Sequence, residues 1–391
     1  MILYPQSDIY DYADVLRPSE RAAILRLRAF LKKEVAPIVD DYWERGEFPE
    51  HLIEPIVQLG LLDPIELREA GIEPGPVFAG FRLFEIARVD ASLATYFSGQ
   101  ATMIMSAVEH GASDAQREQL LEQVRQYQLR GVFAITEPDH GSDVARGLET
   151  TATRDGERWV VSGHKRWIGS AAYATHICVV AREAGSRAMR AFLVPRDAPG
   201  VSVTKIEHKG SLRIVNNADI ELRDVVLTEA ARLQGVDSFD DVARMLRHMR
   251  ASVVWLAAGV QAGAYEAALA YVEKRQQFGR PLAGFQLVQG KIAQMLDNLT
   301  SSLGYANRVA MMHAEGNYED AHSALAKFAV SRRMRDTVAI ARELCGGNGI
   351  VLDTGVMRFF CDAEAVYTYE GTDEISALVA ARGATGLGAF K

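Results

Sequence analysis

Cysteine is scarce in this sequence. Only three of the 391 residues are cysteine, and they are far apart at Cys178, Cys345 and Cys361. An odd number without a Cys-x-x-Cys pair disfavours both a disulfide framework and a zinc site, and it is typical of a reducing compartment. The nine histidines show no metal-ligand spacing either. The sequence therefore predicts no metal site.

Basic charge and long apolar runs are also lacking. Lys and Arg number 43 against 51 Asp and Glu, which gives a net charge of -8 and a pI of about 5.7. We therefore expect no nucleic-acid partner and no membrane, either as a span or as a binding surface. Residues 1–8 contain no basic region or apolar run. We expect no signal peptide and a cytoplasmic location, although removal of a transit peptide would leave the same pattern.

The first third of the chain has helical patterns. A helix is predicted to open at Pro18-Ser19 and to end or kink near Pro37, and further helices are expected over residues 81–89 and 115–130. The apolar side of the first helix is expected to contain Ile24, Leu25, Leu27, Phe30 and Leu31. We assign residues 1–130 to a helical domain.

The middle of the chain, residues 131–235, is predicted to be a β domain. Asp155-Gly156 lies between two β-rich runs over residues 151–161, which indicates a hairpin. Gly, Pro and Asp separate further short strands, which we expect over residues 177–181, 188–195, 201–206 and 218–222.

Residues 236–391 are again helical in pattern. One apolar face repeats at helical spacing through Val288, Ile292, Met295, Leu296, Leu299 and Leu303. The cluster Gly346-Gly347-Asn348-Gly349 ends a helix or lets the backbone approach a ligand phosphate, and the pattern alone leaves both interpretations open. The fold class predicted from these patterns is mainly α with an inserted β domain.

The segment from Val366 to Ile375 contains a candidate base. Glu370 follows Tyr367 and Tyr369, whose rings could shield a carboxylate from water and raise its pKa toward neutrality. The same segment is also typical of an ordinary helix start, with Thr372 as the N-cap. By itself this segment favours the helix start, so the function depends on the rest of the chain.

Four blocks of the sequence, in order, resemble the acyl-CoA dehydrogenase and oxidase flavoprotein family. They are Phe-Ala-Ile-Thr-Glu-Pro-Asp-His-Gly-Ser-Asp at 133–143, Gly-His-Lys-Arg-Trp-Ile-Gly-Ser at 163–170, Arg-Gln-Gln-Phe-Gly-Arg-Pro-Leu at 275–282, and Cys-Gly-Gly-Asn-Gly at 345–349 leading to Tyr-Glu-Gly-Thr at 369–372. The resemblance runs from end to end and is strongest to the glutaryl-CoA dehydrogenase branch and to a short-chain acyl-CoA oxidase-like branch. It implies an N-terminal helical domain, a middle β-barrel or sheet domain and a C-terminal four-helix bundle.

The resemblance also implies a reaction. In this family a base takes the α proton of an acyl thioester, and the flavin N5 accepts a hydride from the β carbon. The matching base is Glu370, whose backbone N–H would also help to hold the thioester oxygen. Other branches place the base near residues 248 and 249, but these are His248 and Met249 here, so no carboxylate competes.

The implied cofactor is FAD. The blocks place its contacts at Phe133, Ile135, Thr136, Trp167, Ile168, Gly169, Arg275, Gln277, Phe278, Gln286, Glu343, Gly346, Gly347, Thr372 and Glu374. In this resemblance Arg275 pairs with the pyrophosphate of a neighbouring subunit, because a guanidinium group suits phosphate. A homotetramer is therefore expected, with an electron-transfer flavoprotein as the electron acceptor.

The implied substrate is an acyl-CoA. Its contacts would be made by Ser142, Arg250, Tyr369, Gly371 and Arg382. An ordinary surface arginine is the alternative for Arg250. Pocket length could be limited by Tyr96, Phe97, Met103 and Tyr367.

Two departures from the family pattern bear on the function. Gly169 stands where most of these dehydrogenases have a threonine that bonds the flavin, which leaves open whether the electron acceptor is a protein or oxygen. Ala87 and Ala94 stand where glutaryl-CoA dehydrogenases have the Glu and Arg that bind a distal carboxylate, so an uncharged short acyl chain fits better. The leading expectation is an FAD-dependent short-chain acyl-CoA dehydrogenase of fatty acid metabolism. The alternatives are a decarboxylating glutaryl-CoA dehydrogenase, an oxidase, an enzyme for carrier-protein thioesters and a non-catalytic relative that binds acyl-CoA or flavin.

Overall fold

The computed structural model describes residues 2–389, which form two compact units. Unit 1 contains the chain up to Ala94, the short segment Gly210–Ile214 and the chain from Arg250 onward. Unit 2 contains Thr95–Lys209 and Val215–Met249. Two helices continue from one unit into the other, α6 (Ala91–Ser98) and α10 (Phe239–Lys274).

The N-terminal part of unit 1 is built from short helices. Their bounds are η1 (Tyr12–Val15), α1 (Pro18–Phe30), the π-helix η2 (Leu31–Val35), α2 (Val39–Arg45), η3 (Glu50–Leu52), α3 (Ile53–Gln58), α4 (Ile65–Glu69) and α5 (Pro76–Val89). The expected stop near Pro37 is confirmed, because a turn separates η2 from α2. The expectation for Leu25 is wrong: its side chain is 45% exposed. Ile24, Leu27 and Leu31 form the buried stripe, and Leu25 lies about 100° around the helix from Ile24.

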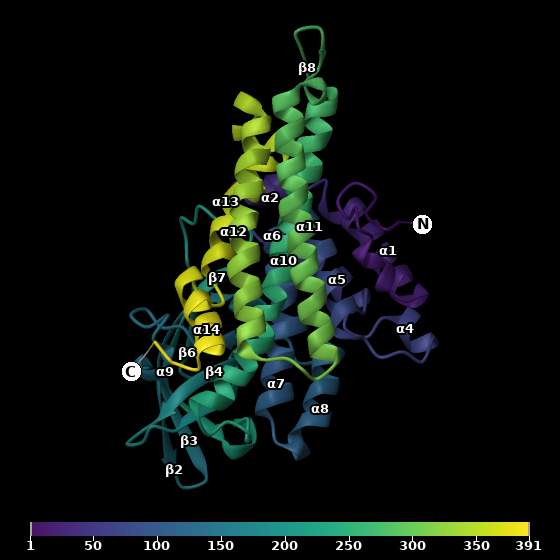
Figure 1. Cartoon of the computed structure of the whole chain (residues 1–391). Helices are drawn as coiled ribbons and strands as arrows, with labels where there is room; N and C mark the ends of the chain where they lie inside the picture. Colours follow the sequence, from purple (N-terminus) through teal and green to yellow (C-terminus); the bar gives the residue numbers. More distant parts are fainter. Residues whose placement is uncertain (1, 390–391) are drawn as a thin grey trace. The chain divides into compact units, whose positions relative to one another are not determined.

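The C-terminal part of unit 1 is a bundle of long helices (Figure 1). After α10 come the β8–β9 hairpin (Gln276–Gln277 and Arg280–Pro281), η7 (Leu282–Gly284), α11 (Gln286–Ala314), α12 (Asp320–Leu344), η8 (Gly346–Ile350), η9 (Leu352–Thr354), α13 (Val356–Thr368) and α14 (Asp373–Thr385). Helices α11, α13 and α14 all pack against α12. The predicted apolar face of α11 is confirmed in part: Met295, Leu299 and Leu303 are fully buried, whereas Val288, Ile292 and Leu296 are partly buried.

Unit 2 begins with helices that lead into a sheet. The helices are the π-helix η4 (Gly99–Ile104), α7 (Met105–Gly111) and α8 (Asp114–Arg125). Ser113 and Gln116 form a capping box at the start of α8. This helix ends at Arg125, earlier than the predicted limit of residue 130.

The sheet of unit 2 has seven strands in the order β1-β4-β2-β3-β7-β6, with β5 paired to β4. The bounds are β1 (Gly131–Ala134), β2 (Thr151–Asp155), β3 (Arg158–Gly169), β4 (His176–Glu183), β5 (Met189–Pro195), β6 (Val201–Lys205) and β7 (Asn217–Thr228). Short helical pieces join them at α9 (Val144–Gly147), η5 (Ala171–Tyr173) and η6 (Glu229–Ala231). The predicted hairpin is confirmed, since Asp155 and Arg158 are the last pair of the β2–β3 register.

The sheet encloses an apolar core that sets the register of its strands. Trp159, Val161, Ile177 and Phe192 are among its buried members. At the start of β3 the buried Trp159 and Val161 alternate with more exposed residues, as expected for a strand that covers one face of a core. This curled sheet in the middle of a mainly helical chain confirms the predicted fold class.

Helix α10 corrects one expectation. It is long and apolar enough to cross a membrane by length and composition, although no such segment was expected. However, 78% of its most apolar window is buried inside the protein, which is typical of a core helix.

Candidate active site

Glu370 lies in the turn between α13 and α14, in a left-handed backbone conformation. Its φ is 55°, and the φ of the following Gly371 is 94°. For a residue other than glycine this conformation costs about 1–2 kcal/mol. Such strain persists only where the surrounding structure holds it, and it is common at functional sites.

Contacts on both sides of Glu370 hold this turn. Lys327 on α12 is almost completely buried, and its Nζ donates hydrogen bonds to the carbonyl oxygens of Tyr367 (3.0 Å) and Gly371 (2.6 Å). The Thr372 hydroxyl caps α14 by accepting a hydrogen bond from the N–H of Ile375 at 3.3 Å. The predicted N-cap is thus confirmed alongside the candidate base.

The charge environment of Glu370 has two opposing parts. Burial raises the pKa of its carboxyl group, whereas the nearby cations Arg250 and Lys327 lower it, and burial wins. Within residues 2–389, neither the carboxylate nor the backbone N–H of Glu370 has a hydrogen-bond partner. Both groups are therefore available to a ligand.

Arg250 on α10 is a buried cation beside this turn. Its side chain is 9% exposed, and among the described residues its Nε has no hydrogen-bond partner. A Cβ built on Gly371 would lie 3.7 Å from that Nε, so the arginine reaches the turn itself. An unpartnered buried guanidinium nitrogen disfavours the surface-arginine alternative.

The two tyrosines before Glu370 differ in their surroundings. The guanidinium of Arg335 lies 4.5 Å from the centre of the Tyr367 ring, and the Tyr367 side chain helps to lower the pKa of Asp373. Tyr369 is half-buried at the end of α13. Shielding of Glu370 by these rings stays a prediction.

The remaining predicted contacts near this turn are exposed. Glu374 lies in the first turn of α14 and Arg382 in its last turn. The side chain of Arg382 is exposed, and its carbonyl oxygen accepts a hydrogen bond from the N–H of Gly386 at 2.8 Å.

In unit 2, the predicted flavin loop follows β1. Phe133 is buried in this strand. The carbonyl of Ile135 accepts a hydrogen bond from Lys165 Nζ at 3.0 Å, and that of Thr136 accepts the N–H of Arg166 at 2.8 Å. No described residue hydrogen-bonds to the Thr136 hydroxyl, so it is available to a ligand.

A buried ion pair supports this loop. Lys165 Nζ lies 2.8 Å from Glu137 Oε1, and both side chains are buried. Glu137 also accepts the backbone N–H groups of Glu149 (2.6 Å) and Thr150 (2.9 Å). Burial would raise the pKa of Glu137, but Lys165 and these hydrogen bonds outweigh it and lower the pKa.

Trp167, Ile168 and Gly169 form the end of β3. Trp167 has a φ of 66° and is 52% exposed, which is unusual for so large an apolar side chain. Ile168 is buried in the sheet core. A Cβ on Gly169 would make ordinary contacts of 3.5 Å with Val215 and 3.7 Å with Asn217, so the chain has room for a side chain there. Ser142 lies in an exposed loop before α9.

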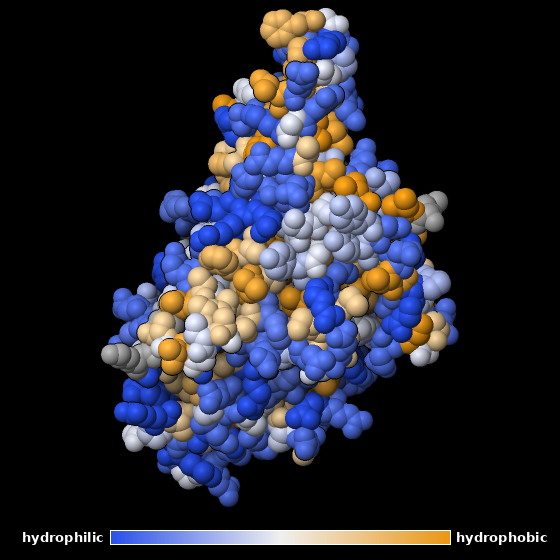
Figure 2. Space-filling model, viewed as in Figure 1, coloured by the Kyte–Doolittle hydropathy of each residue, from blue (hydrophilic) through white to orange (hydrophobic). Residues whose placement is uncertain are grey.

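A third group of predicted contacts lies on the β8–β9 hairpin of unit 1. Arg275, Gln277 and Gln286 are all exposed, and the carbonyl of Arg275 accepts the N–H of Leu282 at 2.8 Å to close the hairpin. Phe278 is 93% exposed, and Figure 2 shows apolar side chains at this tip. Arg275, Gln277 and Phe278 thus form one exposed group at the hairpin, and Gln286 follows η7 as the first residue of α11.

The glycine cluster after α12 has features of both predicted roles, a helix end and a close approach of the backbone to a ligand. Gly346 has a φ of 57° just beyond the helix end, as a helix-ending glycine does. Gly349 packs so tightly that a Cβ would overlap the carbonyl of Arg342, whereas Cβ atoms on Gly346 and Gly347 would meet open space. Glu343 forms an ion pair with Lys291 on α11.

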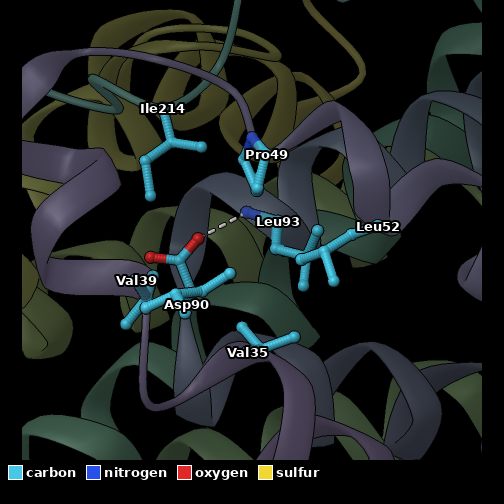
Figure 3. Close-up of a pocket in the computed structure, with 8 residues that line it drawn as sticks. Val35, Val39, Pro49, Leu52, Asp90, Leu93 and Ile214 are labelled. Carbon is cyan, nitrogen blue, oxygen red and sulfur yellow. Dashed lines mark hydrogen bonds between the residues drawn. The ribbon is translucent and has the colours of Figure 1, made fainter.

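A small pocket in unit 1 is not the substrate site (Figure 3). It is lined by Val35, Ile38, Val39, Pro49, Leu52, Asp90, Leu93 and Ile214, and the Asp90 carboxylate accepts the N–H of Leu93 inside it at 2.6 Å. Its volume of about 10 Å³ has room for about one water molecule.

Among residues 2–389, no three His, Cys, Asp or Glu side chains gather where they could hold a metal ion.

Sequence reasoning missed three residues that hold these loops, namely Lys327, Lys165 and Glu137. Lys327 had a usable signal, since it continues the buried stripe of α12 that contains Ser323, Val330 and Met334. A lysine at such a position needs a partner in the interior.

Comparison with known families identifies the chain. The N-terminal, middle and C-terminal domains of acyl-CoA dehydrogenases match residues 17–127, 132–225 and 239–385. A probable acyl-CoA dehydrogenase of Bacillus subtilis, YngJ, is 30% identical over 363 residues, which cover 91% of this chain and 95% of that protein. The chain therefore belongs to the acyl-CoA dehydrogenase family of oxidoreductases. The predicted boundaries at 130 and 235 stay a prediction.

Two other relatives are similar over nearly the whole chain. The bovine mitochondrial short-chain specific acyl-CoA dehydrogenase is 31% identical over 362 residues, or 90% of this chain and 87% of that protein. A glutaryl-CoA dehydrogenase of Mycobacterium smegmatis, solved in complex with FADH2, has a TM-score of 0.91 at 29% identity and covers 99% of this chain and 100% of its own.

Proposed function

We propose that this acyl-CoA dehydrogenase removes one hydrogen each from the α and β carbons of a short-chain acyl-CoA, with Glu370 taking the α proton. The observation that carries the proposal is the free carboxylate of Glu370, whose pKa is raised by burial and which accepts no hydrogen bond from residues 2–389. A base with a pKa closer to neutrality takes a proton more readily.

FAD is the cofactor of this family, and this chain uses it as well. Bound FAD supplies a hydride acceptor for the β carbon at its N5 atom. The chain has groups that suit such a ligand, namely the free hydroxyl of Thr136, the exposed ring of Trp167 and the exposed guanidinium of Arg275. The open space beside Gly346 and Gly347 suits a close approach of the backbone.

The α proton becomes acidic when donors hold the thioester oxygen as negative charge develops on it. The free backbone N–H of Glu370 is such a donor. Glu370 would then act twice, through its carboxylate on the proton and through its main chain on the carbonyl. Arg250, with its unpartnered Nε, would bind a polar group of the CoA portion.

An uncharged acyl chain is supported by α5 and α6. Ala87 and Ala94 are both fully buried and offer no cation to a distal carboxylate. The charged residues nearby already pair with each other: Glu85 with Arg28 (2.8 Å) and Arg88 (2.6 Å), and Arg88 with Glu266 (2.6 Å). Burying a dicarboxylic substrate there would leave its second carboxylate unpaired.

The electron acceptor and the assembly belong to the same proposal. We expect an electron-transfer flavoprotein as acceptor, a homotetramer in which the exposed Arg275 hairpin meets a neighbouring subunit, and a cytoplasmic location. Oxygen is the second candidate acceptor, because Gly169 has no hydroxyl to bond the flavin where most of these dehydrogenases have a threonine. Rapid reoxidation of the substrate-reduced enzyme in air would identify an oxidase.

An anaerobic titration of the purified holoenzyme, followed by flavin absorbance, tests the proposal. Butanoyl-CoA should bleach the flavin near one equivalent per site, and glutaryl-CoA at the same concentrations should not. Faster bleaching by glutaryl-CoA would contradict the assignment. If neither ligand bleaches bound FAD, carrier-protein thioesters become the candidates.

A further inference from the structure

Lys327 is a buried cation that the reaction itself does not use. Its side chain is 1% exposed in the interior of the helical bundle, where an ammonium group is costly unless it is paired. Burial lowers the pKa of Lys327 to about 8, against the attraction of Glu370. The free-energy cost of burying this ammonium group suggests that Lys327 has a function, and its contacts indicate which one.

The contacts of Lys327 bracket the base. Its two acceptors, the carbonyl oxygens of Tyr367 and Gly371, lie on either side of Glu370 in the sequence. Glu370 and Gly371 both have left-handed backbone conformations, so this turn needs an external restraint. One ammonium group thus ties the end of α13 to the start of α14.

We propose that Lys327 is a positioning residue for the base: its ammonium group clamps the turn that contains Glu370 and places a positive charge beside the carboxylate. This inference rests on the proposed function and deepens it. Because the donors of Lys327 go to backbone carbonyls, the charge stabilises the ionised base and leaves its oxygens free for the substrate.

Two other charged groups, Arg250 and Asp373, act on this cluster. Arg250 approaches from α10 and acts on Glu370 in the same direction as Lys327. Asp373 approaches from α14 but is paired with Arg332 at 2.6 Å. Loss of Lys327 would therefore leave Arg250 as the cation acting on Glu370, and the ionised carboxylate would be less favourable than before.

The first test is the pH dependence of anaerobic flavin reduction by butanoyl-CoA in the holoenzyme. In Lys327→Met the acid limb of the rate should move to higher pH by about one unit, because an opposite charge at close range shifts a pKa by about that much or more. Lys327→Arg keeps the charge and the donors, and should keep the limb in place. Ser376→Ala is the matched control: it removes a neutral donor to the same Gly371 carbonyl (3.4 Å) and should not move the limb.

The second test needs no substrate and separates this inference from the proposed function. Thermal midpoints of the holoprotein are compared for Lys327→Met in the wild-type and Glu370→Gln backgrounds. The loss should be larger in the wild type, where an ionised partner stays behind. Equal losses in the two backgrounds would overturn the proposal whatever the substrate is. It would also be overturned if Lys327→Met kept the wild-type acid limb, or if Lys327→Arg shifted the limb as far as Lys327→Met.

Discussion

The two loops to which the reaction is assigned, one in each unit, share a design and differ in one respect. In unit 2, buried Lys165 holds the carbonyl of Ile135 before the predicted flavin contacts. In unit 1, buried Lys327 holds the carbonyls of Tyr367 and Gly371 around the base. Each lysine thus stabilises a loop of irregular backbone from the inside.

The difference lies in the carboxylate that each lysine faces. Glu137 is bonded directly to Lys165 and to two backbone N–H groups, and its pKa is lowered. Glu370 has no hydrogen-bond partner among residues 2–389, and its pKa is raised. A fully paired carboxylate stabilises a loop, whereas a carboxylate that reacts must stay unpaired while its backbone is held.

The largest effect is expected from removing the free carboxylate. Glu370→Gln should retain FAD yet reduce its flavin about 10²–10⁴-fold more slowly with butanoyl-CoA, the range that general-base catalysis contributes. Rapid mixing under anaerobic conditions measures the rate. Glu364→Gln, a change at an exposed carboxylate paired with Arg335 at 2.8 Å, is the control and should react at the wild-type rate.

The paired carboxylate should matter for stability instead. Lys165→Met leaves Glu137 buried and unpaired, so it should lower the free energy of unfolding in urea by about 3–5 kcal/mol and reduce the flavin content. Lys165→Met with Glu137→Gln should recover most of the loss, because a neutral amide still accepts the two backbone N–H groups. A loss below about 1 kcal/mol in the single variant would show that this pair does not hold the loop.

A smaller effect is expected at the cap beside the base. Thr372→Ala removes the hydroxyl that accepts the N–H of Ile375 and should cost about 1 kcal/mol of stability. Thr372→Ser keeps the acceptor and should cost a small fraction of that. If both changes were equally costly in thermal unfolding, the cap would not be the cause.

The smallest effect is a contrast in pH dependence. Glu370 has a raised pKa when folded, so the stability it contributes is present below its ordinary value of 4.5 and is lost as the pH rises through the raised pKa. As the pH rises from 4 to 8, the thermal midpoint of Glu370→Gln should therefore increase relative to that of the wild type.

Glu137 should behave in the opposite way. Its contribution is present above pH 4.5 and is lost as the pH falls through its lowered pKa, so Glu137→Gln should lose most stability near neutral pH. Parallel pH profiles for the two variants would mean that the two carboxylates do not differ as described.

Local patterns predicted much of the fold. The hairpin at Asp155-Gly156 and the buried face of α11 follow from turn chemistry and periodicity, which depend on neighbouring residues. Leu25 was misassigned because it borders the buried stripe of α1, and only packing decides such positions.

The buried residues that hold the two loops of the site could not be predicted from local patterns. Lys165 and Glu137 lie 28 residues apart in the sequence, and Lys327 is 40 residues from Tyr367. Such contacts depend on the tertiary fold. The left-handed conformations of Trp167 and Glu370 were equally hidden, because neither residue type favours them.

The pH dependence of anaerobic flavin reduction in the wild-type holoenzyme, measured at low butanoyl-CoA concentration, tests the central claim most directly. At low substrate the profile reports the ionisation of the free enzyme's base. A desolvated Glu370 predicts an acid limb with a pKa above the ordinary 4.5, and this limb should be absent from the residual rate of Glu370→Gln. A limb at or below 4.5, or one that persists in Glu370→Gln, would contradict the account of a free base with a raised pKa.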